Sequence, residues 1–453
     1  MIRKHHGIAA AIVIICMIRC GFSQVVVNQK WGQEILSLEK CIETGLANSK
    51  SMHSALMKVQ EARAKAEETK TIVLPLFKMT TMYTRLSTIP AFEVTLPFPP
   101  PMPSSIEISP SISNNYNLLF TMQQPLYPVS GLKNTIKAAK NDALAKQEDY
   151  NKEKNEFIYI IKNTYWSLYK ALEFTKLLDE NVELVRAHLA DVQHFYEQGL
   201  AKNIEVLKVQ VQLSNMQLLQ IEAHNAVKLS RVALNSLIGV PLDNETQIEA
   251  KIISIQEDFK ELDVLKKEAI EKRAEVKSLE HTINVADAGL KIAQALKYPV
   301  VALVGNLNLA RPNQRIFPLQ DKFIETWDIS IIAAYDIWNW KATNHRITQA
   351  QAQLAQAYDG MSLLKDSISL EITQNYLELA RVKEKISVAG EGVKQAEENY
   401  RITNERFKAG MALNSELLDA EVSLLQTKVS RTQALIDYEI AKAKLEKSMG
   451  ESK

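Results

Sequence analysis

Two glycine turns, 211 residues apart, constrain this chain more than any other feature. Gly199 interrupts a long charged helical pattern within YEQGLAKNIEVL, and Gly410 does the same within FKAGMALNSELL. Similar residues recur at this offset, without a gap, from about residue 115 to residue 239. Examples are Tyr165 and Tyr376, Val182 and Val393, Leu207 and Leu418, and Gly239 and Gly450. The fold must therefore use one supersecondary unit twice.

Upstream of residue 115 the offset between the two copies becomes 224, as the pair Leu38 and Leu262 indicates. The first copy therefore has 13 additional residues between about residues 84 and 114. Residues 90–110 hold 7 of the 14 prolines in the chain. Because proline lacks a backbone donor and favours extended polyproline geometry, we expect a loop here that leaves the rest of the repeat undisturbed.

Hydrophobic periodicity divides each copy into helix, strand, loop, strand, long helix, turn and helix. The first repeat, residues 24–238, is predicted to contain helices at 37–73, 131–198 and 203–238 and strands at 74–88 and 112–124. A linker at 239–260 joins the repeats. The second repeat, residues 261–453, is predicted to contain helices at 261–297, 342–409 and 414–449 and strands at 299–310 and 326–337.

The long helices follow a coiled-coil period. One stripe steps by four and three before the first turn and keeps that spacing after it, at Leu178, Val182, Val185, Leu189, Val192 and Tyr196 and then at Ile204, Leu207, Val211, Ser214, Leu218 and Ile221. Such a period keeps one seam facing a partner helix. A helix over residues 131–198 would be ~100 Å long at 1.5 Å per residue, so the pattern predicts rods and not a compact globule.

Each glycine turn is expected to close an antiparallel helix pair. Gly199 and Gly410 can adopt the left-handed conformation that ends the outgoing helix. Asn203 and Asn414 are good N-cap residues for the returning helices, and each is followed by an acidic residue in the first turn. The sequence therefore predicts two helical hairpins with matching tips.

The predicted strands alternate between an apolar and a polar face. The apolar faces are Tyr116, Leu118, Phe120 and Met122 in one strand and Trp327, Ile329, Ile331, Ala333 and Tyr335 in another. This pattern fits strands of an outer membrane barrel, and it also fits a small soluble sheet lying on the helices. Four strands cannot close a barrel and open edges are not tolerated in a bilayer, so the membrane interpretation requires oligomerisation. Three copies would supply twelve strands.

Residues 1–23 have the pattern of a secretory signal peptide. MIRKHH is a basic start, residues 8–18 form an apolar run, and small residues precede a cleavage site after Ser23. The apolar run is too short to span a bilayer. Cleavage would leave Cys41 as the single cysteine, and its position on an apolar helix stripe predicts a core residue and not a disulfide partner.

Several classes of function find no support. The net charge of +1 argues against nucleic acid as a partner. The sequence contains no phosphate-binding glycine loop, no zinc-type His or Cys spacing and no Gly-x-Ser-x-Gly. His188 and His194 lie on different helix faces and are expected to be ordinary seam or surface residues. We therefore expect no enzyme, and no catalytic residue, cofactor or metal site.

The ordered set of these features resembles the TolC-type outer membrane efflux proteins. The resemblance is carried by the signal peptide, the duplicated unit, the two hairpin tips and QQPLYPVSG at residues 123–131, which is similar to the family's strand-to-helix junction. The matching segment of the second repeat, AYDIWNWKA at residues 334–342, departs from that pattern because it lacks the proline and the glycine.

The resemblance implies a fold class that is mainly α with a membrane β-barrel part. It implies a homotrimer with a 12-stranded barrel in the cell outer membrane, four strands from each chain, in contact with outer membrane lipid. An α-helical tunnel would reach into the periplasm. The implied function is the passive exit duct of a tripartite efflux system, which works with a periplasmic adaptor protein and an inner-membrane pump.

The resemblance also carries site residues over to the hairpin tips. The implied adaptor contacts are Gly199, Leu200, Gly410 and Met411. The implied periplasmic gate is a ring of carboxylates, to which Glu205, Glu416 and Asp419 would contribute. Such a ring would attract cations, although acidic residues in the first turn of a helix are also favoured by the helix dipole alone.

Some relatives close the mouth with an Arg and a Tyr near these tips. The matching positions hold Ala412 and Phe407, so the groups of that polar latch are missing here. Two alternatives stay open at this stage. The protein could be the outer membrane duct of a type I protein secretion system, or an exported coiled-coil scaffold without a pore.

Overall fold

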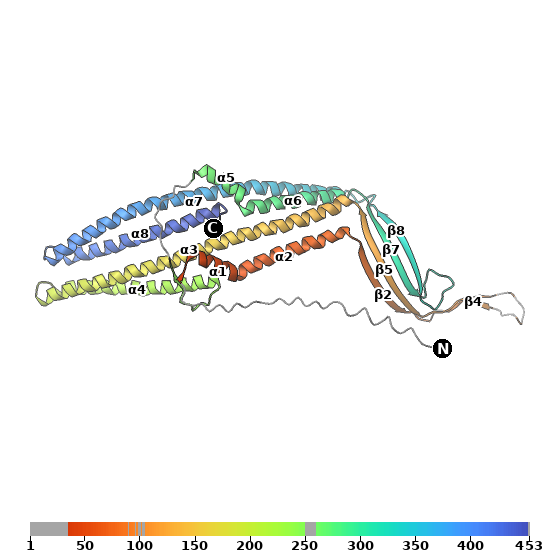
Figure 1. The fold of residues 1–453 in the computed structure, drawn as a ribbon, viewed down its shortest axis with the longest axis horizontal. Helices are drawn as coiled ribbons and strands as arrows, with labels where there is room; N and C mark the ends of the chain where they lie inside the picture. Colours follow the sequence, from red (N-terminus) through yellow and green to blue (C-terminus); the bar gives the residue numbers. More distant parts are fainter. Residues whose placement is uncertain are drawn as a thin grey trace.

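The structure, a computed structural model, describes residues 35–249 and 260–451 except residues 89, 96, 98–100 and 102–104. Long helices run side by side along most of the molecule, and a curved sheet extends from one end (Figure 1). The two glycine turns lie at the opposite end (Figure 1). The predicted signal peptide, residues 1–23, and residues 250–259 of the predicted linker lie outside the described residues.

Both repeats contain the same succession of elements. The first consists of α1 (Leu38–Asn48), α2 (Lys50–Lys70), a 3-10 turn η1 (Thr71–Val73), β2 (Leu76–Arg85), β5 (Asn114–Tyr127), α3 (Val129–Glu197) and α4 (Asn203–Ile238). The second consists of α5 (Leu262–Lys272), α6 (Ala274–Ala295), β7 (Val300–Arg311), β8 (Ile324–Ala334), α7 (Ala342–Lys408) and α8 (Asn414–Ser448). A short parallel pair, β1 (Ile35–Leu36) with β6 (Gln247–Ile248), joins the segment before α1 to the segment after α4.

The single helices predicted at 37–73 and 261–297 are wrong, because each is divided in two. At Ser49 the backbone is extended and the side chain accepts a hydrogen bond from the backbone N–H of Met52, so this residue is an N-cap that begins α2. At Arg273 the backbone is also extended. The buried guanidinium of Arg273 bonds Glu275 and Glu371, which belong to α6 and α7.

The proline-rich segment is also more ordered than predicted. It contains a small antiparallel pair, β3 (Phe92–Thr95) with β4 (Ser105–Ser109), where only a loop was expected. This pair lies beyond the main sheet, at the end remote from the helices (Figure 1). The insertion leaves the main sheet intact, because the flanking strands β2 and β5 pair with each other along ten residues.

The main sheet has the antiparallel order β2-β5-β7-β8. Its register gives it one apolar face, on which two neighbouring rows are Phe77, Met122, Gly305 and Ile329, and Met79, Phe120, Leu307 and Trp327. The opposite face contains a polar row in which Thr121 bonds Asn306 and Asn306 bonds Asp328. The two apolar strand faces that the sequence predicted therefore lie on the same side of the sheet.

The strand register also displays the duplication. Leu76 pairs with Gln123 in the first repeat, and Val300 pairs with Ala334 in the second. Adding the sequence offsets of 224 and 211 converts the first pair into the second. The same conversion holds along the whole of both strand pairs, so the two offsets found in the sequence are structural equivalences.

The helices form a layer in which α3 is central. It packs against α2 and α4 on one side and against α6 and α8 on the other, and α7 packs against α6 and α8. The predicted stripe of α3 is buried at Leu178, Val182, Val185 and Val192, whereas Leu189 is half-buried and Tyr196 is exposed. Cys41 is a core residue as predicted, with burial raising the pKa of its thiol to about 12. None of the helices in the described part of the chain has the length and apolar composition that a membrane crossing requires.

The stripe predicted to be the seam of α4 has a different environment. Ile204, Leu207, Val211, Leu218 and Ile221 are between 47% and 62% exposed. The α4 residues buried in the hairpin are on another face and include Val206, Val209, Met216, Ala223 and Val227. The equivalent helix α8 has neighbours on both sides, α3 and α7. The prediction that this stripe is the seam of the first hairpin is therefore wrong, because α4 packs through another face and leaves the stripe uncovered in a single chain.

Candidate functional site at the hairpin tips

Both tips have the same backbone geometry. Gly199 and Gly410 have φ values of +75° and +72°, in the left-handed region. The N–H of Leu200 donates to the carbonyl of Phe195 at 2.8 Å, and the N–H of Met411 donates to the carbonyl of Arg406 at 2.8 Å. These bonds from beyond the glycine back into the last helical turn satisfy carbonyls that a helix end would otherwise leave unpaired.

The returning helices begin without the caps that the sequence predicted. Asn203 and Asn414 are the first residues of α4 and α8, and the N-cap positions are Lys202 and Leu413, neither of which makes a side-chain cap bond. The N-cap prediction is therefore wrong by one residue. The displacement leaves the Asn414 amide available for a contact with the other hairpin.

Asn414 ties the second hairpin to the first. Its Nδ2 donates to Oε2 of Glu205 at 3.0 Å and to the Glu205 carbonyl at 3.3 Å. Lys208 lies 3.2 Å from the same carboxylate. The hydrogen bond from Asn414 is the main cause that lowers the pKa of Glu205, and Lys208 adds to it. Of the three gate candidates, Glu205 is therefore the one whose charge is already partnered.

Glu416 and Asp419 are in a different situation. Both are exposed, and neither has a salt bridge among the described residues. The repeat explains the contrast, because Asp419 is equivalent to Lys208 at the offset of 211. The first repeat therefore pairs an acid with a base in this turn, whereas the second repeat places two acids three residues apart on one exposed helix face.

The predicted adaptor contacts present apolar side chains beside the glycines. Leu200 is 73% exposed and Met411 is 66% exposed. An ideal Cβ added to Gly199 or Gly410 would meet no atom within 4 Å. The tips are therefore open surfaces with one large apolar side chain each, and no described residue covers them.

Behind the tips, the four helix ends share one apolar cluster. Its buried members are Val182, Val185, Val192, Val206, Val209, Met216, Phe407 and Leu417. Phe407 contacts Phe195 with ring centroids 5.7 Å apart, and Ala412 packs against the cluster. The two positions that lack the polar latch groups thus contribute apolar contacts that hold the hairpins together.

The sequence interpretation missed a polar pair within this cluster. Nδ1 of His188 lies 3.1 Å from Oε1 of Glu421, and the two side chains are 3% and 2% exposed. His188 was expected to be an ordinary seam or surface residue, and Glu421 was not considered. A signal was present, because Glu421 lies between Ala420 and Leu424 on the buried stripe of α8 and interrupts it with a carboxylate.

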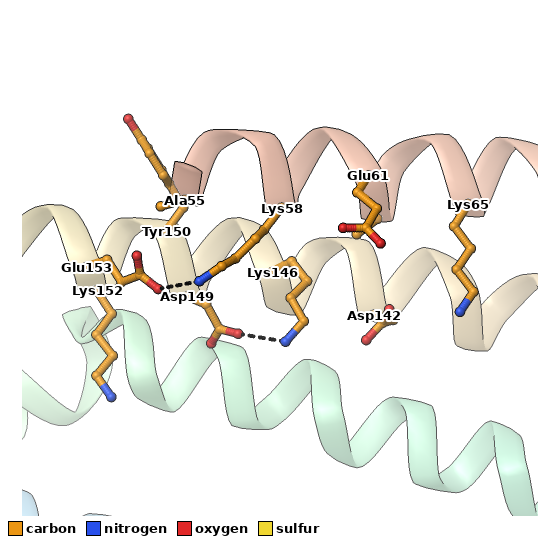
Figure 2. Close-up of a pocket in the computed structure, with 11 residues that line it drawn as sticks. Ala55, Lys58, Glu61, Lys65, Asp142, Lys146, Asp149, Tyr150, Lys152 and Glu153 are labelled. Atoms are coloured by element: carbon orange, nitrogen blue, oxygen red, sulfur yellow. Dashed lines mark hydrogen bonds and ion pairs between the residues drawn. The ribbon is translucent and has the colours of Figure 1, made fainter. Parts of the chain in front are cut away.

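A second candidate place is a groove of about 550 Å³ between α2 and α3. Figure 2 shows lysine and carboxylate side chains along it, with two pairs in contact. Lys58 lies 3.6 Å from Glu153, and Lys146 lies 3.1 Å from Asp149. Four lysines and four carboxylates line the groove, so it has no net charge with which to select a ligand. Among the described residues no cluster of His, Cys, Asp and Glu is suited to hold a metal ion.

The chain is similar to known proteins both in sequence and in structure. A family model described as "Outer membrane efflux protein" matches residues 41–240 and 265–451. Protein CyaE of Bordetella pertussis (strain Tohama I) is 26% identical over 155 residues, which cover 34% of this chain. The match spans only 31% of the length of that relative.

Solved structures match over nearly the whole chain. The outer membrane protein VceC of Vibrio cholerae has a TM-score of 0.77 at 17% identity, covering 92% of this chain and 96% of VceC. The Campylobacter jejuni CmeC outer membrane channel has a TM-score of 0.76 at 16% identity, covering 93% and 90%. The open state of the Neisseria gonorrhoeae MtrE outer membrane channel has a TM-score of 0.77 at 15% identity, covering 91% and 89%.

Proposed function

The chain belongs to the outer membrane efflux protein family, and from this premise we propose that three copies form the passive exit duct of a tripartite exporter. A member of this family is an outer membrane channel and not an enzyme, as the sequence predicted. In the proposal, an inner-membrane pump supplies the energy, and a periplasmic adaptor joins the pump to the hairpin tips. The duct itself supplies a wall, a lumen and a mouth.

The observation that carries the proposal is a pair of matching unpaired edges. Within the chain, β5 of the first repeat pairs with β7 of the second. The repeat makes β8 equivalent to β5 and β2 equivalent to β7, and these two strands are the edges of the sheet. The junction that joins the repeats inside one chain can therefore join β8 of one copy to β2 of the next.

Repetition of this junction three times would produce one closed sheet of twelve strands. Closure would leave no row of unpaired backbone groups, which is required in a lipid environment. It would also place the apolar rows on the outside, where Phe77 and Trp327 are now 74% and 72% exposed. The polar row with Asn306 and Asp328 would line the interior.

The helices offer the same kind of edge. Inside the chain, Leu177 of α3 lines a small groove with Val429 and Thr432 of α8. The equivalent residues are Val388 of α7, which is 73% exposed, and Leu218 and Ile221 of the uncovered α4 stripe. Contact between α7 of one copy and α4 of the next would bury both apolar surfaces and close the helices into a hollow tunnel.

At the tips, the equivalence of the two repeats predicts which contacts the gate candidates make between copies. Asn203 corresponds to Asn414, and Glu416 corresponds to Glu205. In the closed ring, Asn203 of one copy would therefore donate to Glu416 of another, as Asn414 does to Glu205 within one chain. Asp419 would stay without a basic partner, so three copies of the pair Glu416 and Asp419 would give the mouth its acidic character.

Disulfide crosslinking in the predicted register tests the proposal. Met122 lies opposite Gly305, and the repeat converts this pair into Ala333 of one copy and Thr81 of the next. In a Cys41→Ala background, Ala333→Cys with Thr81→Cys should produce covalent dimers and trimers on a non-reducing gel. The matched control, Met122→Cys with Gly305→Cys, has the same strand geometry and should crosslink within one copy only.

The crosslinked trimer, purified from outer membranes in detergent, should then conduct ions in planar bilayers. Monomers without crosslinks, in the presence of an efficient Met122 to Gly305 control, would contradict the ring. A trimer that forms in this register but never conducts would leave the assembly intact and contradict the duct.

A further inference from the structure

A buried polar pair joins the two hairpins behind their tips. His188 belongs to α3 and Glu421 to α8, so the pair links the first hairpin to the second. Nδ1 lies 3.1 Å and 3.2 Å from the two carboxylate oxygens. Because an ionised carboxylate can only accept hydrogen bonds, Nδ1 carries a proton. The other ring nitrogen, Nε2, is buried with no hydrogen-bond partner.

The surroundings of this pair are almost free of compensating charge. The Phe407 ring lies edge-on to the imidazole with centroids 5.3 Å apart. On α7, the Tyr400 phenol has its pKa raised by burial, by Glu421 and by Asp191 of α3, so it stays neutral. Residues 209–221 of α4 contain no charged side chain. Elsewhere on α8, Asp419 is exposed and Lys428 lies 3.6 Å from Glu397.

The number of protons on the pair therefore decides its net charge in an apolar site. When the imidazole carries a proton on both nitrogens and the carboxylate is ionised, the net charge of the pair is zero. Loss of one of these protons leaves a buried carboxylate facing a neutral ring, and the Asp191 charge near Tyr400 adds to the repulsion. Burial of an unbalanced charge is costly, so the closed junction favours the state that holds the extra proton.

The repeat shows which junctions contain such a pair. The residues equivalent to His188 and Glu421 are Asn399 and Gln210, both exposed in the single chain. In the closed ring these two amides would meet across the junction between copies. The junction within each copy thus has a titratable pair, and the junction between copies has a neutral one.

We propose that the His188 and Glu421 pair is a proton-dependent latch that holds the two hairpins of each copy together and loosens when the proton is lost. The proposal rests on the proposed function in one respect, because the hairpin ends are then the mouth of the duct. Separation of α3 from α8 hydrates both groups, and the imidazole releases its proton to water. Closure takes up a proton, so acidification favours the closed junction.

The expected size of the pH response follows from the number of protons taken up on closure. Coupling of one proton to closure changes the open-to-closed ratio by at most about tenfold per pH unit for each junction. Histidine side chains in general change charge between pH 5 and 8, so the comparison is made between pH 6 and pH 8. The mouth should be more closed at pH 6 than at pH 8.

Thiol labelling measures this opening without reference to transport. Val192 is 1% exposed and lies one helical turn from His188. In a Cys41→Ala background, the maleimide reaction rate at Val192→Cys is divided by the rate at an exposed site, Lys394→Cys, which removes the intrinsic pH dependence of the thiol. The ratio should rise several-fold from pH 6 to pH 8 in the trimer with the native pair.

Two variants supply the comparison. His188→Asn with Glu421→Gln gives the inner junction the same amides as the equivalent junction between copies, and its labelling ratio should not change with pH. The single Glu421→Gln variant keeps an acceptor for Nδ1–H but removes the negative charge that holds the extra proton, so its labelling ratio should no longer rise with pH. The converse variant, Asn399→His with Gln210→Glu, places the titratable pair between copies. In this variant the junction between copies should also be more open at pH 8 than at pH 6. A ratio that still rises with pH in both loss variants, or a ratio that falls with rising pH in the trimer with the native pair, would overturn the latch.

Conductance separates this proposal from the proposed function. A trimer that never conducts but shows the pH-dependent labelling would refute the duct and leave the latch standing. A conducting trimer with a flat labelling ratio would refute the latch and leave the duct standing.

Discussion

At the scale of single residues, the tips are held by contacts between side chains that are far apart in the sequence. Asn414 and Glu205 are separated by 209 residues, and the bond between them depends on Asn414 being inside the helix and not at its cap. A cap residue would direct its side chain to its own helix. The one-residue displacement thus changes a local role into a tie between hairpins.

This tie should depend on pH in a defined direction. The hydrogen bond from Asn414 lowers the pKa of Glu205, so the ionised carboxylate stabilises the junction. This stabilisation is complete at pH values above the ordinary pKa of glutamate, and it is lost as the pH falls through the lowered pKa. Asn414→Ala should increase deuterium uptake at both tips at pH 7 and should have little effect at pH 3. Ser415→Ala, an exposed neighbour on the same helix, is the control. Equal uptake in the two variants at pH 7 would contradict the tie.

At the scale of elements, four helix ends in the described part of the chain use glycine in the left-handed region, but in different surroundings. Gly199 and Gly410 face open space, whereas an added Cβ at Gly239 would lie 2.6 Å from the Asn48 Cβ. The tip glycines are therefore required by backbone conformation alone. Gly239 is required both by its conformation and by the close approach of α1 to the end of α4.

The two kinds of glycine should respond differently to substitution. Gly199→Ala should lower stability by the conformational term alone, about 1–2 kcal/mol for a left-handed residue with a Cβ. Gly239→Ala adds a clash of two carbon atoms and should lower the melting temperature by a clearly larger amount. Scanning calorimetry of both variants in detergent at one heating rate provides the measurement. A Gly199→Ala variant that is as destabilised as Gly239→Ala would show that the tips are less open than described.

The exposed apolar residues of the tips, Leu200 and Met411, are the proposed contacts with the adaptor. Leu200→Asp with Met411→Asp should leave trimer formation and conductance unchanged, because both side chains lie outside the packed clusters. The same variant should abolish export in cells that produce the adaptor and the pump, since an adaptor that buries these residues would have to bury a carboxylate instead. The control variant, Gln198→Asp with Lys408→Asp, adds the same two carboxylates at exposed positions beside the turns and should export normally. Normal export by the double variant would remove the tips from the adaptor interface.

At the scale of the whole molecule, the two repeats are equivalent in architecture but not in charge. Glu205 is paired with Lys208 and Asn414, whereas Glu416 and Asp419 have no basic partner in the described chain. A ring of three copies would therefore alternate between neutralised and acidic sectors at its mouth. Ion selectivity should depend on the second repeat.

Selectivity in planar bilayers tests this asymmetry. Glu416→Gln with Asp419→Asn should move the reversal potential in a salt gradient toward zero. The double variant removes two carboxylates without basic partners from each copy, and therefore six from the three-copy ring. Glu205→Gln should change it much less, since its charge is already balanced. The opposite ranking, with Glu205 dominant, would mean that the constriction lies on the first hairpin.

The sequence by itself determined the elements whose signal is local. The period of the long helices, the glycine turns and the alternation of the strands arise from contacts between residues a few positions apart, and the two offsets of the duplication agree with the strand register. The resemblance based on these features leads to the family that the comparisons show.

Only the tertiary structure decided what each face contacts. The stripe on α4 has the same spacing as that on α3, but it is uncovered because α4 lies at the edge of the layer and α3 at its centre. The break at Arg273 depends on Glu371, 98 residues away, and the pair of His188 with Glu421 spans 233 residues. A carboxylate or a guanidinium is stable in a core only where a distant element brings its partner, and local sequence does not contain that partner's position.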